Sequence, residues 1–80
     1  MYTKPHCPYC VKAANILNQK SIPFEEIDIS KDPLKVTEML SRSNGRKTVP
    51  QIFINNTHVG GCDDLEELFL SGKLEDLLAN

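Results

Sequence analysis

The feature that most constrains this 80-residue chain is a pair of cysteines near its start, in the segment Cys7-Pro8-Tyr9-Cys10. Proline is favoured at the first position of a helix, where its missing N–H costs nothing, so Pro8 predicts a helix capped by Cys7. The unpaired N–H groups and the positive dipole end of that helix would lower the pKa of Cys7 below the roughly 8.5 of free cysteine. Cys10 lies in the first turn, close enough to attack a disulfide formed by Cys7. The spacing predicts a redox pair at a helix N-terminus.

Other uses of a CxxC pair fit this chain less well. A structural zinc site needs four ligands, and beyond the pair the sequence offers only Cys62, His6 and His58, so no metal is expected. Covalent haem attachment needs a histidine after the second cysteine, where this chain has Val11. A structural disulfide of a secreted domain would call for an even number of cysteines and a signal peptide. The chain has three cysteines, and we expect no signal peptide.

Length and charge limit the classes of partner. Eighty residues predict one domain, spanning 1–80, and the charged fraction of 25% is usual for a globular protein. A net charge of −2 gives no basic surface of the kind that nucleic acid or an anionic membrane requires. No apolar run approaches the roughly 18 residues of a membrane span. We therefore expect no nucleic-acid or membrane partner and a reducing cytoplasm as the location.

The first half of the sequence predicts a strand, a helix and a second strand. The strand covers 1–4, apolar residues at helical spacing predict a helix over 8–20, and 24–29 is the next strand. Three such elements within about 30 residues form a βαβ unit, in which the strands are parallel and the crossover is right-handed.

The second half predicts a helix, a hairpin and a further helix. Asp32-Pro33 begins a helix that Asn44-Gly45 ends, and strands at 51–54 and 57–59 flank an Asn-Asn turn. A helix then starts near Asp63-Asp64 and ends at Gly72, followed by a last turn over 74–78. This βαβ-α-ββ-α order predicts an α/β, thioredoxin-like fold: a four-stranded mixed sheet with helices on both faces.

Three blocks of the sequence resemble the dithiol glutaredoxins, in the same order and at similar separations. They are Cys7-Pro8-Tyr9-Cys10, Thr48-Val49-Pro50 and Gly60-Gly61-Cys62-Asp63-Asp64. The Trp-Cys-Gly-Pro-Cys motif of thioredoxins and the Cys-Gly-Phe-Ser motif of monothiol glutaredoxins are both absent. The resemblance implies a monomeric, glutathione-dependent disulfide oxidoreductase that serves electron transport and cell redox homeostasis.

The resemblance also implies a mechanism. Cys7 would be the nucleophile and Cys10 the resolving thiol, and together they would form the redox-active disulfide. Glutathione would be the cosubstrate, and the substrates would be glutathionylated proteins and protein disulfides.

A glutathione site follows from the same resemblance. The Val49-Pro50 bond would be cis, leaving Thr48 and Val49 to bind a substrate cysteine by its backbone; the alternative is a trans proline that only starts a strand. Asp63 would pair with the γ-glutamyl ammonium, serve as a plain helix cap, or do both. Arg46 and Lys47 are weaker candidates for the glycine carboxylate. The implied site comprises Lys4, Tyr9, Thr48, Val49, Pro50, Gly61, Cys62 and Asp63.

Several roles stay open at this point. Lys4 would pair with the glycine carboxylate, lower the Cys7 pKa or be an ordinary solvated lysine, and His6 would tune that pKa or simply be exposed. We expect the Cys62 side chain to be a small buried hydrophobe rather than a regulatory thiol, and His58 to lie on the surface. Two other functions remain: an iron–sulfur cluster held between two chains by Cys7 and glutathione, or electron donation to one dedicated reductase.

Overall fold

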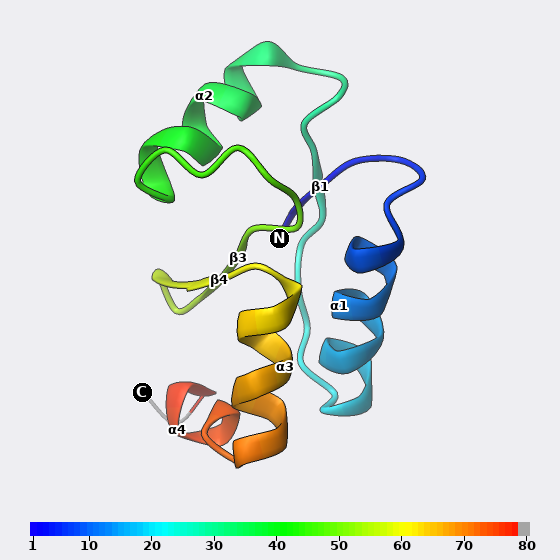
Figure 1. Ribbon diagram of the computed structural model, residues 1–80, viewed down its shortest axis with the longest axis vertical. Helices are drawn as coiled ribbons and strands as arrows, with labels where there is room; N and C mark the ends of the chain where they lie inside the picture. The colour runs from blue at the N-terminus through cyan, green and yellow to red at the C-terminus, as the bar shows by residue number, and fades with distance from the viewer. Residues whose placement is uncertain (79–80) are drawn as a thin grey trace.

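The computed structural model describes residues 1–78. Its elements follow the predicted order (Figure 1): β1 (Tyr2–Thr3), α1 (Pro8–Gln19), β2 (Ile27–Asp28), α2 (Pro33–Arg42), β3 (Ile52–Ile54), β4 (Thr57–Gly60), α3 (Cys62–Ser71) and α4 (Leu74–Leu78). The second strand is shorter than the predicted 24–29. The Met1 amino group donates to the Glu25 carbonyl oxygen at 2.7 Å, so the first residue of the chain lies opposite Glu25. The residues before Glu25 therefore have no part of the first strand to pair with.

The sheet is mixed, as predicted, but its four strands form two ladders. β1 and β2 are parallel, with Tyr2 opposite Ile27, and β3 and β4 are antiparallel. The ladders meet at one antiparallel bridge, where the backbones of Tyr2 and Gln51 exchange hydrogen bonds of 2.9 and 3.2 Å. Pro50 precedes Gln51 and has no N–H to donate, so the pairing between the two ladders does not continue past Gln51 on this side. The described residues therefore do not form one continuous four-stranded ladder.

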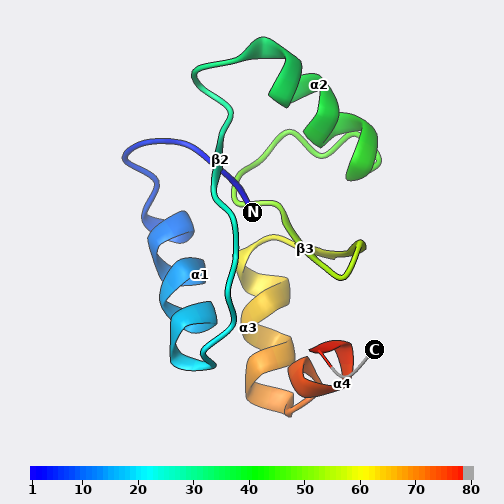
Figure 2. The ribbon, with the colours of Figure 1, turned by 180° about the vertical axis from the view of Figure 1, so that it is seen from behind.

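Alternating side chains give the sheet two apolar faces. Ile52 and Ile54 of β3 join a cluster with the buried faces of α1, α3 and α4, whereas Phe53 points to the other face, where α2 packs through Met39. Figures 1 and 2 show α1 and α3 side by side and α2 apart from them, so the prediction of helices on both faces is confirmed.

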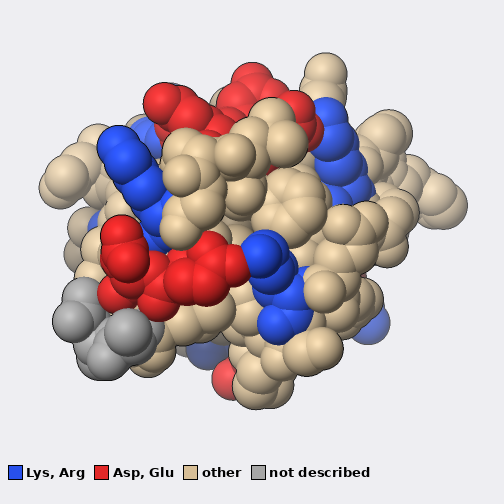
Figure 3. Space-filling model, turned by 90° about the horizontal axis from the view of Figure 1, so that it is seen from below, with Lys and Arg blue, Asp and Glu red and all other residues tan. Residues whose placement is uncertain are grey.

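Charges of both signs are mixed over the end of the molecule seen in Figure 3. Lys12 pairs with Glu66, and Lys20 pairs with Glu75, joining α1 to α3 and α4. Lys and Arg do not gather into one patch on this face. No helix within residues 1–78 is both long and apolar enough to cross a bilayer.

Candidate active site

Cys7 caps the N-terminus of α1, as predicted. Its backbone is extended (φ −109°, ψ 102°), and its sulfur accepts a hydrogen bond from the Cys10 N–H at 3.2 Å. Pro8 occupies the first helical turn, and that turn contains no acidic residue. The positive end of the α1 dipole therefore acts on sulfur alone, an arrangement that favours a thiolate.

Cys7 and Cys10 are joined by a disulfide, with their Cα atoms 5.2 Å apart. The two sulfurs differ in access: Cys7 is partly exposed, whereas Cys10 is buried, with 4% of its surface accessible. A substrate or thiol arriving from solvent can thus reach Cys7 but not Cys10.

The Val49-Pro50 peptide bond is cis and lies beside Cys7. The Val49 carbonyl oxygen lies 4.0 Å from the Cys7 sulfur, and the Val49 N–H has no hydrogen-bond partner within residues 1–78. The cis prediction is confirmed, and the alternative of a trans proline is wrong. An extended substrate could therefore pair with Val49 beside the reactive sulfur.

A groove of about 320 Å³ lies next to this turn. It brings together all but one of the implied glutathione residues, and it adds Arg46 and Asp64: its lining is Tyr9, Arg46, Thr48, Val49, Pro50, Gly61, Cys62, Asp63 and Asp64. Lys4 is the exception, because it lines a separate hollow that also contains His6 and Cys7. The groove is within the size range of small-molecule sites.

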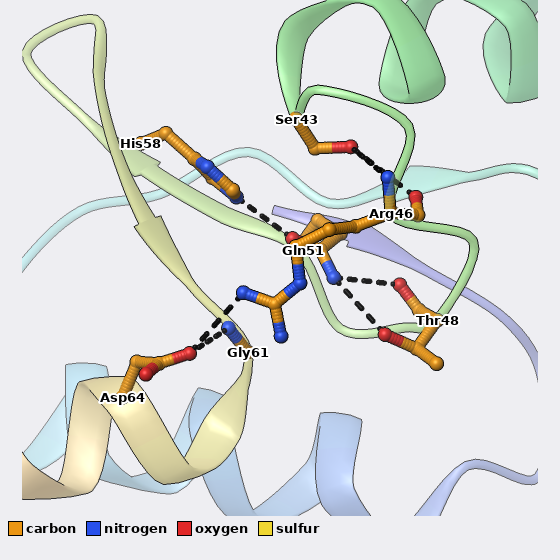
Figure 4. A network of polar contacts seen from close by, with 7 residues as sticks. All are labelled: Ser43, Arg46, Thr48, Gln51, His58, Gly61 and Asp64. Atoms are coloured by element: carbon orange, nitrogen blue, oxygen red, sulfur yellow. Dashed lines mark hydrogen bonds and ion pairs between the residues drawn. The ribbon is translucent and has the colours of Figure 1, made fainter.

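The far wall of the groove is the N-terminus of α3, which Asp64 caps. Gly61 is the N-cap residue, and its N–H donates to Asp64 Oδ2 at 2.9 Å, while Arg46 Nη1 lies 3.3 Å from the same oxygen (Figure 4). The Gly61 N–H, followed by Arg46, lowers the pKa of Asp64 below its usual value. At Gly60, which has a φ of +120°, an added Cβ would collide with this carboxylate.

Asp63 is left free by this arrangement. It is exposed and makes no hydrogen bond or ion pair with any residue of the described part of the chain. The alternative that Asp63 is the helix cap is therefore wrong, since its neighbour performs that role. A capping acid lies three residues after the N-cap, which is the spacing of Asp64 from Gly61, but the sequence alone does not mark Gly61 as the N-cap.

The remaining thiol and the two histidines differ in how deeply they are buried. Cys62 is buried in the cluster beneath α1 and α3, as expected, and burial raises the pKa of its thiol. His6 is exposed, with a left-handed φ of 58°. The surface prediction for His58 is wrong: the ring is partly buried, stacks on Phe53 at 4.7 Å and lies 2.8 Å from Gln51 Oε1. Alternation along β4 places His58 on the same face as Phe53.

Comparison with known proteins decides the family. A family model described as glutaredoxin matches residues 1–59. The chain belongs to the glutaredoxin family. It is 50% identical over 78 residues to Glutaredoxin 3 of Escherichia coli, covering 98% of this chain and 93% of that protein. It is 48% identical over 81 residues to Glutaredoxin 1 of Rickettsia conorii, covering 100% of this chain and 79% of the relative.

Solved glutaredoxin structures agree with this assignment. The solution structure of a glutaredoxin from Brucella melitensis is 53% identical and superimposes with a TM-score of 0.82, over 96% of this chain and 83% of that one. A buckwheat glutaredoxin–glutathione complex gives a TM-score of 0.86 at 27% identity, over 98% and 73% of the two chains. The protein is a glutathione-dependent thiol-disulfide oxidoreductase of thioredoxin-like fold.

Proposed function

We propose that Cys7 attacks the glutathione sulfur of a glutathionylated protein. The protein–glutathione S–S bond breaks as the Cys7–glutathione bond forms, and the protein leaves as a thiolate that takes up a proton. A second glutathione thiolate then attacks the sulfur of the bound glutathione, which gives glutathione disulfide and frees the Cys7 thiolate. The observation that carries this assignment is the position of Cys7: it caps α1 and is accessible, whereas Cys10 is buried.

Protein disulfides would follow a second route that uses both cysteines. Cys7 forms a mixed disulfide with one substrate sulfur, and Cys10 then attacks Cys7, which releases the reduced substrate and leaves the Cys7–Cys10 disulfide. Two glutathione molecules reduce that disulfide and leave as glutathione disulfide. The short separation of the pair, with a Cα–Cα distance of 5.2 Å, supports a resolving role for Cys10.

We propose that glutathione lies in the groove between the cis-proline turn and α3. Its cysteine backbone would pair with Val49, and its γ-glutamyl carboxylate would accept N–H groups at the start of α3, those of Cys62 and Asp63, which have no intrahelical acceptor. The γ-glutamyl ammonium would pair with Asp63. This last contact is supported by the exposed, unpaired state of Asp63 and by the pairing of Asp64 with Arg46.

The remaining contacts of this proposal lie at the two ends of the groove. Tyr9, which is 62% exposed, would pack on the bound tripeptide, and Thr48 and Gly61 would shape the backbone beneath it. Lys4 lines the neighbouring hollow and not the groove, so we assign it the outermost contact, with the glycine carboxylate.

The test compares Asp63→Ala with Glu67→Ala, a matched removal of an exposed acid one turn further along α3. Losing one partner of a charge pair at a binding site typically costs about 2 kcal/mol, so Asp63→Ala should lower kcat/KM on a glutathionylated peptide by at least about tenfold. Glu67→Ala should change it little. The same peptide carrying a cysteamine mixed disulfide, which lacks the γ-glutamyl group, should be turned over almost equally by all three proteins. Equal losses on both substrates would place the glutathione site elsewhere.

We also propose that residues 1–80 form one domain that works as a monomer, in a reducing cytoplasm, without a resident metal. The single-domain proposal is supported by a core cluster that unites Met1 with Leu74. Within residues 1–78, no group of three or more His, Cys, Asp or Glu side chains is placed to hold a metal ion. A purified protein that is coloured and dimeric would instead favour the iron–sulfur alternative.

A further inference from the structure

The side chain of Gln51 is fully buried directly behind the cis-proline turn. Its Nε2 donates to the Thr48 carbonyl oxygen at 2.9 Å and to Thr48 Oγ1 at 3.2 Å, and its Oε1 lies 2.8 Å from His58 Nε2 (Figure 4). The mechanism above uses neither Gln51 nor His58. A buried amide with every polar atom engaged is nevertheless a costly arrangement to disturb.

The chemistry of these contacts fixes the direction of each hydrogen bond. A backbone carbonyl can only accept, so the Gln51 NH₂ group must face Thr48 and the Gln51 oxygen must face His58. His58 therefore donates from Nε2. In the neutral ring this is the Nε2–H tautomer, and a chain of donors runs from His58 through Gln51 to the Thr48 carbonyl.

This chain of hydrogen bonds links the turn that contains Thr48 and Val49 to His58 in the β3–β4 hairpin. The segment between α2 and β3 contains no regular backbone pairing before Gln51, which bridges to Tyr2. At the other end, His58 lies on β4 and stacks on Phe53, and the Arg42 guanidinium lies 4.2 Å from the Phe53 ring centroid. The Gln51 amide thus connects Thr48 in the turn to His58 in the hairpin, and Arg46 makes a second connection from this segment to Asp64.

We propose that Gln51 and His58 are positioning residues that hold Thr48 and Val49 at the distance from Cys7 at which a substrate backbone can pair. The proposal rests on the function proposed above, in which Val49 binds the cysteine of glutathione. Without the amide, the turn would keep its sequence and its cis bond but lose the side-chain contact between Thr48 and the hairpin. Substrate binding would weaken, while the acidity of Cys7, which α1 sets, would not change.

The test uses the full chain with two shape-preserving substitutions. Gln51→Met keeps the length of the side chain without its polar atoms, and His58→Phe keeps a ring against Phe53 without the donor. Each should lower kcat/KM on a glutathionylated peptide about tenfold, and Gln51→Met with His58→Phe should lower it little further, because the two residues act in one chain. The rate of Cys7 alkylation by iodoacetamide should stay within about twofold of wild type in all three variants.

A control variant separates positioning from general loss of stability, and a measurement on His58 tests the direction of the hydrogen bonds. Leu74→Ala removes a fully buried side chain in α4, away from the turn, and should lower the melting temperature without changing kcat/KM below the unfolding transition. The ¹⁵N signals of His58 should show a protonated Nε2 in wild type.

If Gln51→Met reduces glutathionylated peptide with the same kcat/KM as wild type, the inference is overturned. A Leu74→Ala loss equal to that of Gln51→Met, or a protonated Nδ1 with a bare Nε2 on His58, would overturn it as well. A wild type that cannot use glutathione at all would instead contradict the proposed function.

Discussion

Two helices of this protein begin with a cysteine at or next to the cap, and the two cysteines have opposite character. At α1, Cys7 is the N-cap, is partly exposed and accepts an N–H on its sulfur, in a first turn without acidic residues. At α3, Cys62 lies one residue after the N-cap Gly61, is buried and is followed by two acids, Asp63 and Asp64.

The difference shows that a helix N-terminus alone does not make a thiol reactive. The helix dipole and the free N–H groups stabilise whichever negative group lies against them. At α1 that group is sulfur. At α3 the N–H of Gly61 bonds to the Asp64 carboxylate, and burial raises the pKa of Cys62. One helix end thus holds a sulfur suited to act as a nucleophile, and the other is capped by a carboxylate.

The largest expected effect separates the two cysteines directly. Cys7→Ser should lower glutathione-dependent reduction by about a thousandfold or more, because a serine hydroxyl is not ionised near neutral pH and cannot form the mixed disulfide. Cys62→Ala should retain most of the activity, since the proposed contact uses only the backbone N–H at that position. Initial rates on a glutathionylated peptide measure both, and a Cys62→Ala protein as inactive as Cys7→Ser would abolish the distinction.

A second, smaller effect distinguishes the roles within the CxxC pair. Cys10→Ser should keep most of its deglutathionylation activity, because that route uses Cys7 and external glutathione. It should lose most of its activity on protein disulfides, about tenfold or more, because no internal thiol resolves the mixed disulfide. Parallel assays on a glutathionylated peptide and on a disulfide-bonded protein measure this. Loss of both activities in a folded Cys10→Ser protein would show that Cys10 takes part in both routes.

The smallest effect concerns the cap of α3. Asp64→Asn keeps an oxygen for the Gly61 N–H but removes the charge, so it should lower the free energy of unfolding at pH 7 by about 0.5 kcal/mol. The pKa of Asp64 is lowered in the folded protein, so its contribution is present above the unfolded value near 3.9 and is lost as the pH falls through the folded value. Denaturant unfolding should therefore give converging stabilities for wild type and variant below about pH 4. A difference that persists or grows there would exclude the ionised carboxylate as its cause.

Features that depend on neighbouring residues in the sequence could be predicted from it. Pro8 after Cys7 indicated the cap of α1, and Asp32-Pro33 indicated the start of α2, where Asp32 Oδ1 accepts the Leu34 N–H at 2.9 Å. The resemblance to glutaredoxins supplied the cis proline. It also supplied the residues that the structure gathers in one groove.

Features that depend on strand register, or on competition between neighbouring residues for one role, could not be predicted from the sequence. Gln51 and His58 meet only because β3 and β4 pair as they do, with an irregularity between Ile52 and Phe53. Either Asp63 or Asp64 could have capped α3 by composition, and only the placement of Gly61 as N-cap decides for Asp64. The lengths of β1 and β2 depend on where each strand finds a partner, which periodicity does not report.

The central claim is that Cys7 is reactive because it caps α1 and reaches solvent. The most direct test is the rate of alkylation of each cysteine in the reduced protein, measured against pH and assigned by peptide mapping. We predict that Cys7 alkylates fastest, with an apparent pKa below the roughly 8.5 of free cysteine, and that Cys10 and Cys62 react slowly near neutral pH. Fast labelling of Cys10 or Cys62 below pH 7, with Cys7 slow, would contradict the account.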